Sequence, residues 1–174
     1  MESWAEKYRP ESLSDLIGNT RTINDLKNWA NSWGNKTTKK GVILSGPPGC
    51  GKTSAAIGLA NDMGWGIIEL NASDTRSGAV IEGIALRAGL FQTFGNEGLS
   101  SRNLILLDEA DNLYERAKQS KKKVKNYSDR GGKKAITKTL EQTKQPVVIT
   151  VNDLYNLTKG TGSKIKRLAL TLKF

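Results

Sequence analysis

The residues with the clearest chemical potential form one unbroken string, Gly46-Pro47-Pro48-Gly49-Cys50-Gly51-Lys52-Thr53. The string fits GxxxxGK[ST], follows the apolar run 42–45 and opens a segment of helical character. Glycines there let backbone N–H groups converge on phosphates, and the helix N-terminus adds the positive end of its dipole. Lys52 would reach the β- and γ-phosphates, and Thr53 would offer its hydroxyl to Mg²⁺. The string therefore predicts a site for ATP and Mg²⁺, with contacts from Pro47, Pro48, Gly49, Cys50, Gly51, Lys52, Thr53 and Ser54. Cys50 is interpreted as a small residue that fits the loop, in preference to a redox group.

Two acids follow a second apolar run, Leu104 to Leu107. Asp108 and Glu109 cannot both stay buried as charges, so they must face a cation, a hydrogen-bond donor or water. Beside a phosphate loop, the first acid is suited to support Mg²⁺ and the second to activate water. Asp111 is expected at a helix start or on the surface, and not as a metal ligand.

Asn152 follows a third apolar run, 147–151. Its side-chain amide could orient the attacking water or contact the γ-phosphate. The alternative is plain turn chemistry, because Asn-Asp is a favourable turn pair. The spacing alone leaves both interpretations open.

These groups need elements that position them, and the apolar periodicity predicts those elements. Helices are expected over 20–33 (with Thr20 as a possible cap), 52–63, 78–94 and 135–142, and strands over 42–45, 67–70, 104–107, 147–150 and 168–174. Strands that alternate with helices are typical of α/β proteins. We therefore predict one domain, with a five-stranded parallel sheet that is covered by helices on both faces.

The composition excludes several function classes. The 174 residues include one cysteine and no histidine, which excludes a disulfide framework, a zinc cluster and His-activated nucleophiles. No apolar run approaches the roughly 20 residues that span a bilayer, and the charged N-terminal residues differ from a signal peptide. We therefore expect a soluble, cytoplasmic protein (nuclear if eukaryotic) with no membrane partner.

The formal net charge of +10 is unevenly distributed. Residues 1–112 carry a net charge of −2, whereas residues 113–174 carry +12. The densest stretch, 116–134, holds nine Lys or Arg and a single acid. Such a run is either a solvated loop or a contact for the phosphate backbone of a nucleic acid, and composition does not separate the two.

Further strings carry a family resemblance. They are 4–10 (WAEKYRP), 13–18 (LSDLIG), 69–74 (ELNASD, extended by TRS) and 129–132 (DRGG). With the phosphate loop and the acidic strand end, they resemble the AAA+ module of clamp loaders, most closely that of the large subunit of archaeal replication factor C. The resemblance covers nearly the whole chain, so residues 1–174 are interpreted as one AAA+ nucleotide-binding domain. Residues 1–19 would be its adenine-pocket segment and 20–174 its P-loop core, with a Lys-rich insertion near 116–128.

The resemblance implies roles that spacing does not. The adenine pocket would be lined by Tyr8, Arg9, Pro10, Ile17 and Gly18. Asn152 would be the sensor of the γ-phosphate, Glu109 the catalytic base and Asp108 the acid that supports Mg²⁺. Residues facing a DNA duplex inside the ring would be Arg76, Arg130, Lys133 and Lys134.

The resemblance also implies partners: small clamp-loader subunits in a hetero-pentamer, the sliding clamp and primer–template DNA. Small subunits carry a Ser-Arg-Cys motif, where this chain has Arg167-Leu168-Ala169, so it would receive a neighbour's arginine finger without supplying one. The chain ends near the end of the family's first domain, so the helical lid and collar are expected to be absent. Hydrolysis by this segment alone would then be weak.

Apolar residues gather at the end of the helix expected over 78–94. Leu90, Phe91 and Phe94 could plug a pocket on the sliding clamp, which is the implied contact, or they could pack in the core. The principal hypothesis is an ATP-hydrolysing clamp-loader motor. The alternatives are a non-hydrolysing DNA- and clamp-binding module with a structural nucleotide site, or another AAA+ DNA remodeller.

Overall fold

Five short apolar runs form one parallel sheet. The computed structural model describes residues 10–36, 39–71, 102–111 and 131–174. Its strands are β1 (Gly41–Ser45), β2 (Gly66–Asn71), β3 (Asn103–Asp108), β4 (Val147–Val151) and β5 (Ala169–Lys173). Their order is β2-β3-β4-β1-β5, and neighbouring strands run parallel. The prediction of a five-stranded parallel sheet is confirmed.

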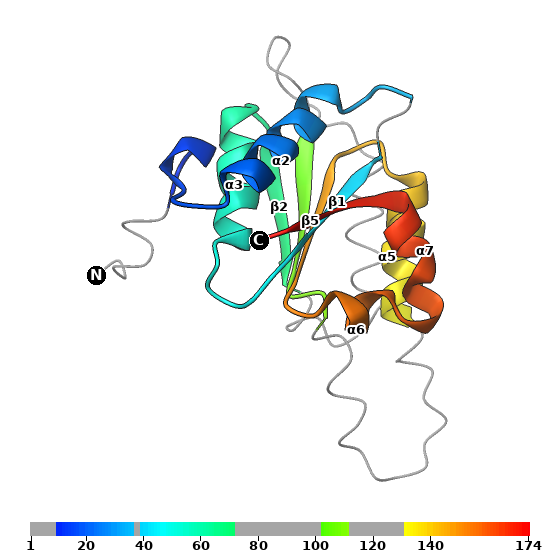
Figure 1. The fold of residues 1–174 in the computed structure, drawn as a ribbon. Helices are drawn as coiled ribbons and strands as arrows, with labels where there is room; N and C mark the ends of the chain where they lie inside the picture. Colours follow the sequence, from blue (N-terminus) through cyan, green and yellow to red (C-terminus); the bar gives the residue numbers. More distant parts are fainter. Residues whose placement is uncertain (1–9, 37–38, 72–101, 112–130) are drawn as a thin grey trace, which may run out of the picture.

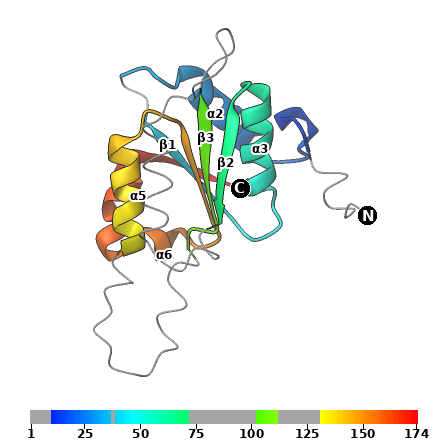
Figure 2. The ribbon, with the colours of Figure 1, turned by 180° about the vertical axis from the view of Figure 1, so that it is seen from behind.

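Helices cover both faces of this sheet (Figures 1 and 2). The elements are η1 (Leu13–Asp15), α2 (Thr20–Ser32), α3 (Lys52–Asp62), α5 (Gly131–Gln142), α6 (Leu154–Thr158), η3 (Gly160–Gly162) and α7 (Ser163–Leu168). The pair α2 and α3 lies on one face, and α5 with α7 lies on the other. Within the described ranges, no helix combines the length and the apolar character needed to cross a bilayer.

The alternation of side chains along each strand explains the two layers. In β1, Val42 and Leu44 belong to the cluster under α2 and α3, while Ile43 belongs to the cluster under α5 and α7. Both faces of the strand are buried, so its sequence is a continuous apolar run. We call the two sides the α2/α3 face and the α5/α7 face.

Several element boundaries differ from the predictions. Asn19, in the left-handed region, is the N-cap of α2 without a side-chain cap bond, so Thr20 does not cap the helix. Helix α5 begins at Gly131, four residues before the predicted start. Leu168 ends α7 and is not part of β5. The helix expected over 78–94 and the Lys-rich stretch 116–128 lie outside the described residues.

The segment before α2 is fixed on the side of α3. Gly58 makes this approach possible, because a Cβ there would lie 2.9 Å from the Ser12 carbonyl carbon. The Leu13 N–H donates to Asp62 Oδ2 at 3.3 Å, and Asn61 donates to the Glu11 carbonyl at 2.8 Å. The described part of the predicted adenine segment is therefore held beside the helix that follows the phosphate loop.

Candidate active site

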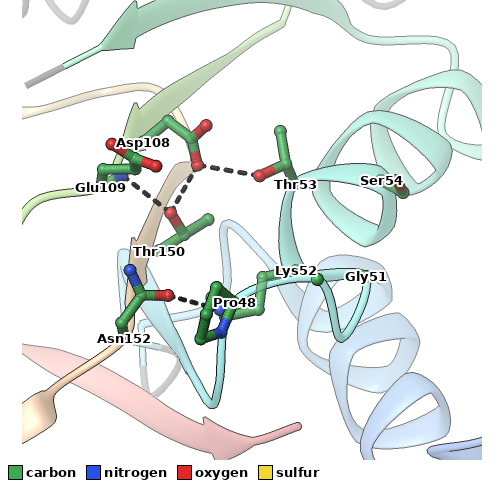
Figure 3. Close-up of a pocket in the computed structure, with 10 residues that line it drawn as sticks. Pro48, Gly51, Lys52, Thr53, Ser54, Asp108, Glu109, Thr150 and Asn152 are labelled. Carbon is green, nitrogen blue, oxygen red and sulfur yellow. Dashed lines mark hydrogen bonds between the residues drawn. The ribbon is translucent and has the colours of Figure 1, made fainter. Parts of the chain in front are cut away.

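The carboxyl ends of β1, β3 and β4 meet at one edge of the sheet, which is where ligands bind in open α/β sheets. A pocket of about 240 Å³ opens there. Figure 3 shows the residues that line it: Pro48, Gly49, Gly51, Lys52, Thr53, Ser54, Asp108, Glu109, Thr150 and Asn152. The structure therefore brings together the phosphate loop, the acidic strand end and the amide after β4.

The phosphate loop depends on its glycines. Gly49 and Gly51 have φ values of +77° and +94°, a left-handed conformation that glycine adopts without steric cost. Gly51 is also the N-cap of α3, so the loop leads directly into the positive end of that helix. At its start, the Gly46 N–H donates to the Val151 carbonyl at 3.2 Å, which ties the loop to β4.

Lys52 points into the pocket from the first turn of α3. Its side chain is 8% exposed, and its ammonium donates to the carbonyls of Gly46 and Pro47 at 2.8 and 2.7 Å. It also donates to Asn152 Oδ1 at 2.9 Å. Lys52 and Asn152 are therefore in contact, although 100 residues separate them in the chain.

The two acids are organised by a threonine (Figure 3). Thr53 Oγ1 donates to Asp108 Oδ1 at 2.9 Å, and Thr150 Oγ1 donates to the same oxygen at 2.5 Å. The Thr150 hydroxyl also accepts the Glu109 N–H at 3.0 Å. One buried hydroxyl thus contacts both acidic residues. Glu109 has φ +52°, a left-handed conformation uncommon for a residue with a side chain.

The donor set fits Mg²⁺ bound together with phosphate. The described residues include no group of three or more His, Cys, Asp or Glu that could hold a metal by themselves. Thr53 and Asp108, hydrogen-bonded at the pocket wall, supply hard oxygen atoms. Mg²⁺ commonly takes one or two protein oxygens and completes its shell with water and substrate phosphates. Thr53 and Asp108 are therefore the residues that would hold it.

Asp111 is not the surface residue that was one of its two expected placements; the residues after it, where a helix would start, lie outside the described residues. It is 8% exposed, and its Oδ2 accepts the N–H groups of Asn152 and Asp153, each at 3.0 Å. Its Oδ1 has no hydrogen-bond partner among the described residues. The chain turns back toward β4 after Asp108, which buries the carboxylate against the end of that strand.

The other predicted nucleotide contacts that the structure describes are not among the residues lining this pocket. Pro47 and Cys50 lie in the loop, with Cys50 Sγ 3.8 Å from the Lys52 ammonium. Pro10 is half-buried, whereas Ile17 is fully exposed and Gly18 adopts φ +87°. Tyr8 and Arg9 lie outside the described residues.

The predicted DNA-facing set needs one correction. Lys133 is 2% exposed and donates to the Lys159 carbonyl at 2.7 Å, so its ammonium faces the protein interior and not a duplex. Lys134, its neighbour on α5, is exposed. Arg76 and Arg130, and the predicted clamp contacts Leu90, Phe91 and Phe94, lie outside the described residues.

Sequence reasoning missed Thr150 altogether and misplaced Asp111. A signal existed for Thr150, because it is the single polar residue in the otherwise apolar strand β4. Asp111 had a weaker signal, as the second Asp in the string Asp108-Glu109-Ala110-Asp111. Its partners are backbone groups some 41 residues away, which no local pattern identifies.

Family matches agree with this geometry. Residues 42–159 match the family described as "ATPase family associated with various cellular activities (AAA)". The chain belongs to this family. Residues 1–80 also match the Rad17 P-loop domain. The fold and the nucleotide-binding loop are thus those of a P-loop ATPase domain, as the resemblance implied.

Curated relatives confirm the resemblance to replication factor C. The chain is 44% identical over 172 residues to the replication factor C large subunit of Methanococcoides burtonii, and 46% identical over 171 residues to that of Methanocella arvoryzae. Each match covers 98% of this chain, but only 31% and 28% of those relatives. The chain therefore spans about a third of the length of the relatives it matches.

Solved structures show the same fold at low sequence identity. A T158V variant of RuvB from Thermotoga maritima superposes with a TM-score of 0.60 at 19% identity, over 96% of this chain and 48% of that chain. A structure described as the basis for katanin self-assembly gives a TM-score of 0.62 at 16% identity, over 100% of this chain and 60% of the other. At these identities the likeness concerns the fold alone.

Proposed function

We propose that this chain is the ATP-binding and ATP-hydrolysing motor domain of a clamp-loader large subunit, which loads a sliding clamp onto primed DNA during replication. The observation that carries the proposal is the convergence of Lys52, Glu109 and Asn152 on one pocket beside the Thr53–Asp108 pair. The similarity to archaeal replication factor C large subunits supports the clamp-loader assignment within the AAA family.

The proposed reaction is in-line attack of water on the γ-phosphorus of ATP. Glu109 accepts a proton from the water as the new P–O bond forms, and the bond to the β–γ bridging oxygen breaks, with its electron pair leaving on ADP. Lys52 neutralises charge on the β- and γ-phosphate oxygens, and Asn152 contacts the γ-phosphate side. When bound at Thr53 and Asp108, Mg²⁺ offsets the charge of the phosphates.

Two further contacts with ATP are proposed: an adenine pocket formed by the N-terminal segment, and an arginine from a neighbouring subunit. Tyr8, Arg9, Pro10, Ile17 and Gly18 are proposed to line the adenine pocket, and the full exposure of Ile17 leaves its apolar surface available to a purine ring. A neighbouring subunit is proposed to supply an arginine to the γ-phosphate. Such an arginine raises the hydrolysis rate by about 10³–10⁵-fold in related ATPases and GTPases.

The remaining proposals concern the macromolecular partners. Arg76, Arg130 and Lys134 would contact the DNA backbone, and the small subunits would complete a hetero-pentamer in the cytoplasm (the nucleus, if the source is eukaryotic). Leu90, Phe91 and Phe94 would contact the sliding clamp. The double variant Phe91→Ala/Phe94→Ala should then weaken clamp binding without altering the melting transition of the domain. Unchanged clamp affinity would assign these residues to core packing.

Single-turnover hydrolysis with added small subunits and primed DNA tests the motor function. Glu109→Gln keeps the size and the backbone position but cannot take the proton, so hydrolysis should fall by about 10²–10⁴ while ATP still binds. Hydrolysis by this variant at the wild-type rate would contradict the assignment of Glu109. No hydrolysis by the wild-type assembly would favour the non-hydrolysing module.

A further inference from the structure

Asp111 joins the two segments that carry the proposed catalytic groups. The Glu109 N–H donates to the Thr150 hydroxyl, and the Ala110 N–H donates to the Thr150 carbonyl at 3.0 Å. Asp111 then accepts the N–H groups of Asn152 and Asp153. These hydrogen bonds join residues 109–111 to residues 150–153, and the Asp111 carboxylate makes two of them.

We infer that Asp111 is a positioning residue for ATP hydrolysis, which holds Asn152 in place by bonding its backbone from the segment that carries Glu109. The inference deepens the proposed function and rests on it.

The geometry supports a role in positioning. Asn152 lies one residue beyond the end of β4 and its side chain is exposed, so the strand ladder does not hold it. Its Oδ1 nevertheless accepts the Lys52 ammonium at 2.9 Å, and the two N–H groups held by Asp111 fix the backbone from which that side chain extends. Bonds from N–H groups to a carboxylate are roughly twice as strong as neutral ones, and Asp111 makes two from a position that is only 8% exposed.

We call the two bonds from Asp111 to the N–H groups of Asn152 and Asp153 the anchor. The anchor also holds the N-cap residue of α6. Asp153, whose N–H Asp111 holds, caps α6 by accepting the N–H groups of Tyr155 and Asn156 at 2.8 and 3.3 Å. The side chain of Asp153 therefore caps α6, while its backbone N–H donates to Asp111. Asp111 is thus the side chain that bonds Asn152 and the residue leading into α6 at the same time.

The test compares Asp111→Ala, Asp111→Asn, Asn152→Ala and Asp111→Ala/Asn152→Ala in the full chain. Amide hydrogen exchange at residues 152 and 153 reports the anchor, and single-turnover hydrolysis with small subunits and primed DNA reports the reaction. In Asp111→Ala, both amides should exchange at least about 10-fold faster, and hydrolysis should fall by about 10²-fold, the cost of a misplaced group.

Asp111→Asn is the matched control. Its amide oxygen can accept the same two N–H groups, so exchange and hydrolysis should stay near wild type. The double variant should hydrolyse ATP no more slowly than Asn152→Ala alone, because residues that act through one another are not additive. If Asp111→Ala does not fold, Asp111→Ser takes its place, since a hydroxyl one atom shorter cannot reach both N–H groups.

Three results would overturn the inference. Unchanged exchange in Asp111→Ala would refute the anchor, and additive rate losses in the double variant would reduce Asp111 to a structural role. Slow hydrolysis by Asp111→Asn with protected amides would assign the effect to charge and not to position. Failure of the proposed function is separate: the wild-type assembly would not hydrolyse ATP, and the exchange comparison would still decide whether the anchor exists.

Discussion

The α2/α3 face and the α5/α7 face pack against the same sheet but carry different charge. Helices α2 and α3 expose two bases and two acids, Arg21, Lys27, Asp25 and Asp62. Helices α5 and α7 expose five bases and one acid, Lys134, Lys138, Lys164, Lys166, Arg167 and Glu141. Both faces bury a cluster of apolar side chains against the sheet, and they differ in the charge that each presents to solvent.

The two regions offer different means of binding phosphate: a shaped pocket and an exposed basic surface. The pocket lies at the carboxyl edge of the sheet and relies on loop N–H groups, the start of α3 and the single ammonium of Lys52. Helices α5 and α7 present several exposed positive charges, and none of their described residues lines the pocket. A shaped site suits one nucleotide, whereas a spread of charges suits a long polyanion read without base specificity.

The largest effect is expected for Lys52→Ala, which should weaken ATP binding at the start of α3. Loss of the ammonium removes charge-assisted bonds to two phosphates, so ATP affinity should fall by about 10³-fold. Isothermal titration calorimetry measures this directly. Lys134→Ala, an exposed lysine on the other face, is the control and should leave ATP affinity unchanged. ATP binding retained by Lys52→Ala would remove the nucleotide from this pocket.

Two leucine-to-alanine substitutions, one on each face, test whether the faces contribute equally to stability but differently to ATP binding. Leu59 in α3 and Leu140 in α5 are both almost fully buried, at 0% and 1% exposure. Either leucine-to-alanine change should lower the free energy of unfolding by about 2–5 kcal/mol in urea titrations. Only Leu59→Ala should also weaken ATP binding, because α3 carries Lys52 and Thr53. Equal losses of ATP affinity would show that the two faces are coupled.

Thr150→Val should lower the rate without lowering affinity. The substitution keeps the shape of the side chain but removes the hydroxyl between Asp108 and Glu109, so single-turnover hydrolysis should fall by about 10–100-fold. Thr150→Ser retains the hydroxyl and should restore most of the rate. A serine variant as slow as the valine variant would indicate packing as the cause.

The smallest effect is expected on the α5/α7 face. The triple variant Lys134→Ala/Lys164→Ala/Arg167→Ala should lower the slope of log affinity for duplex DNA against log salt by about 0.9 for each phosphate that the protein no longer neutralises. Fluorescence anisotropy at several salt concentrations measures the slope. Arg21→Ala/Lys27→Ala is the control from the α2/α3 face. An unchanged slope in the triple variant would show that this face does not bind DNA.

Local chemistry in the sequence accounts for most of the fold and for most of the residues that line the pocket. The glycines and Lys52 predicted the phosphate loop, and the positions of Asp108, Glu109 and Asn152 after apolar runs predicted the shared edge. The order of the strands in the sheet could not be predicted from the sequence, because strand pairing joins residues far apart in the chain. The same limit hid the burial of Lys133 and Asp111, whose partners belong to other elements.

The left-handed backbone of Glu109 has a consequence for heat resistance. A glutamate in that conformation costs about 1–2 kcal/mol, whereas asparagine tolerates it better. Glu109→Asn should therefore raise the melting temperature while it removes the proposed base. Under the proposed role of Glu109, this position gives up stability for activity, and selection for thermal robustness alone would favour a protein without the base.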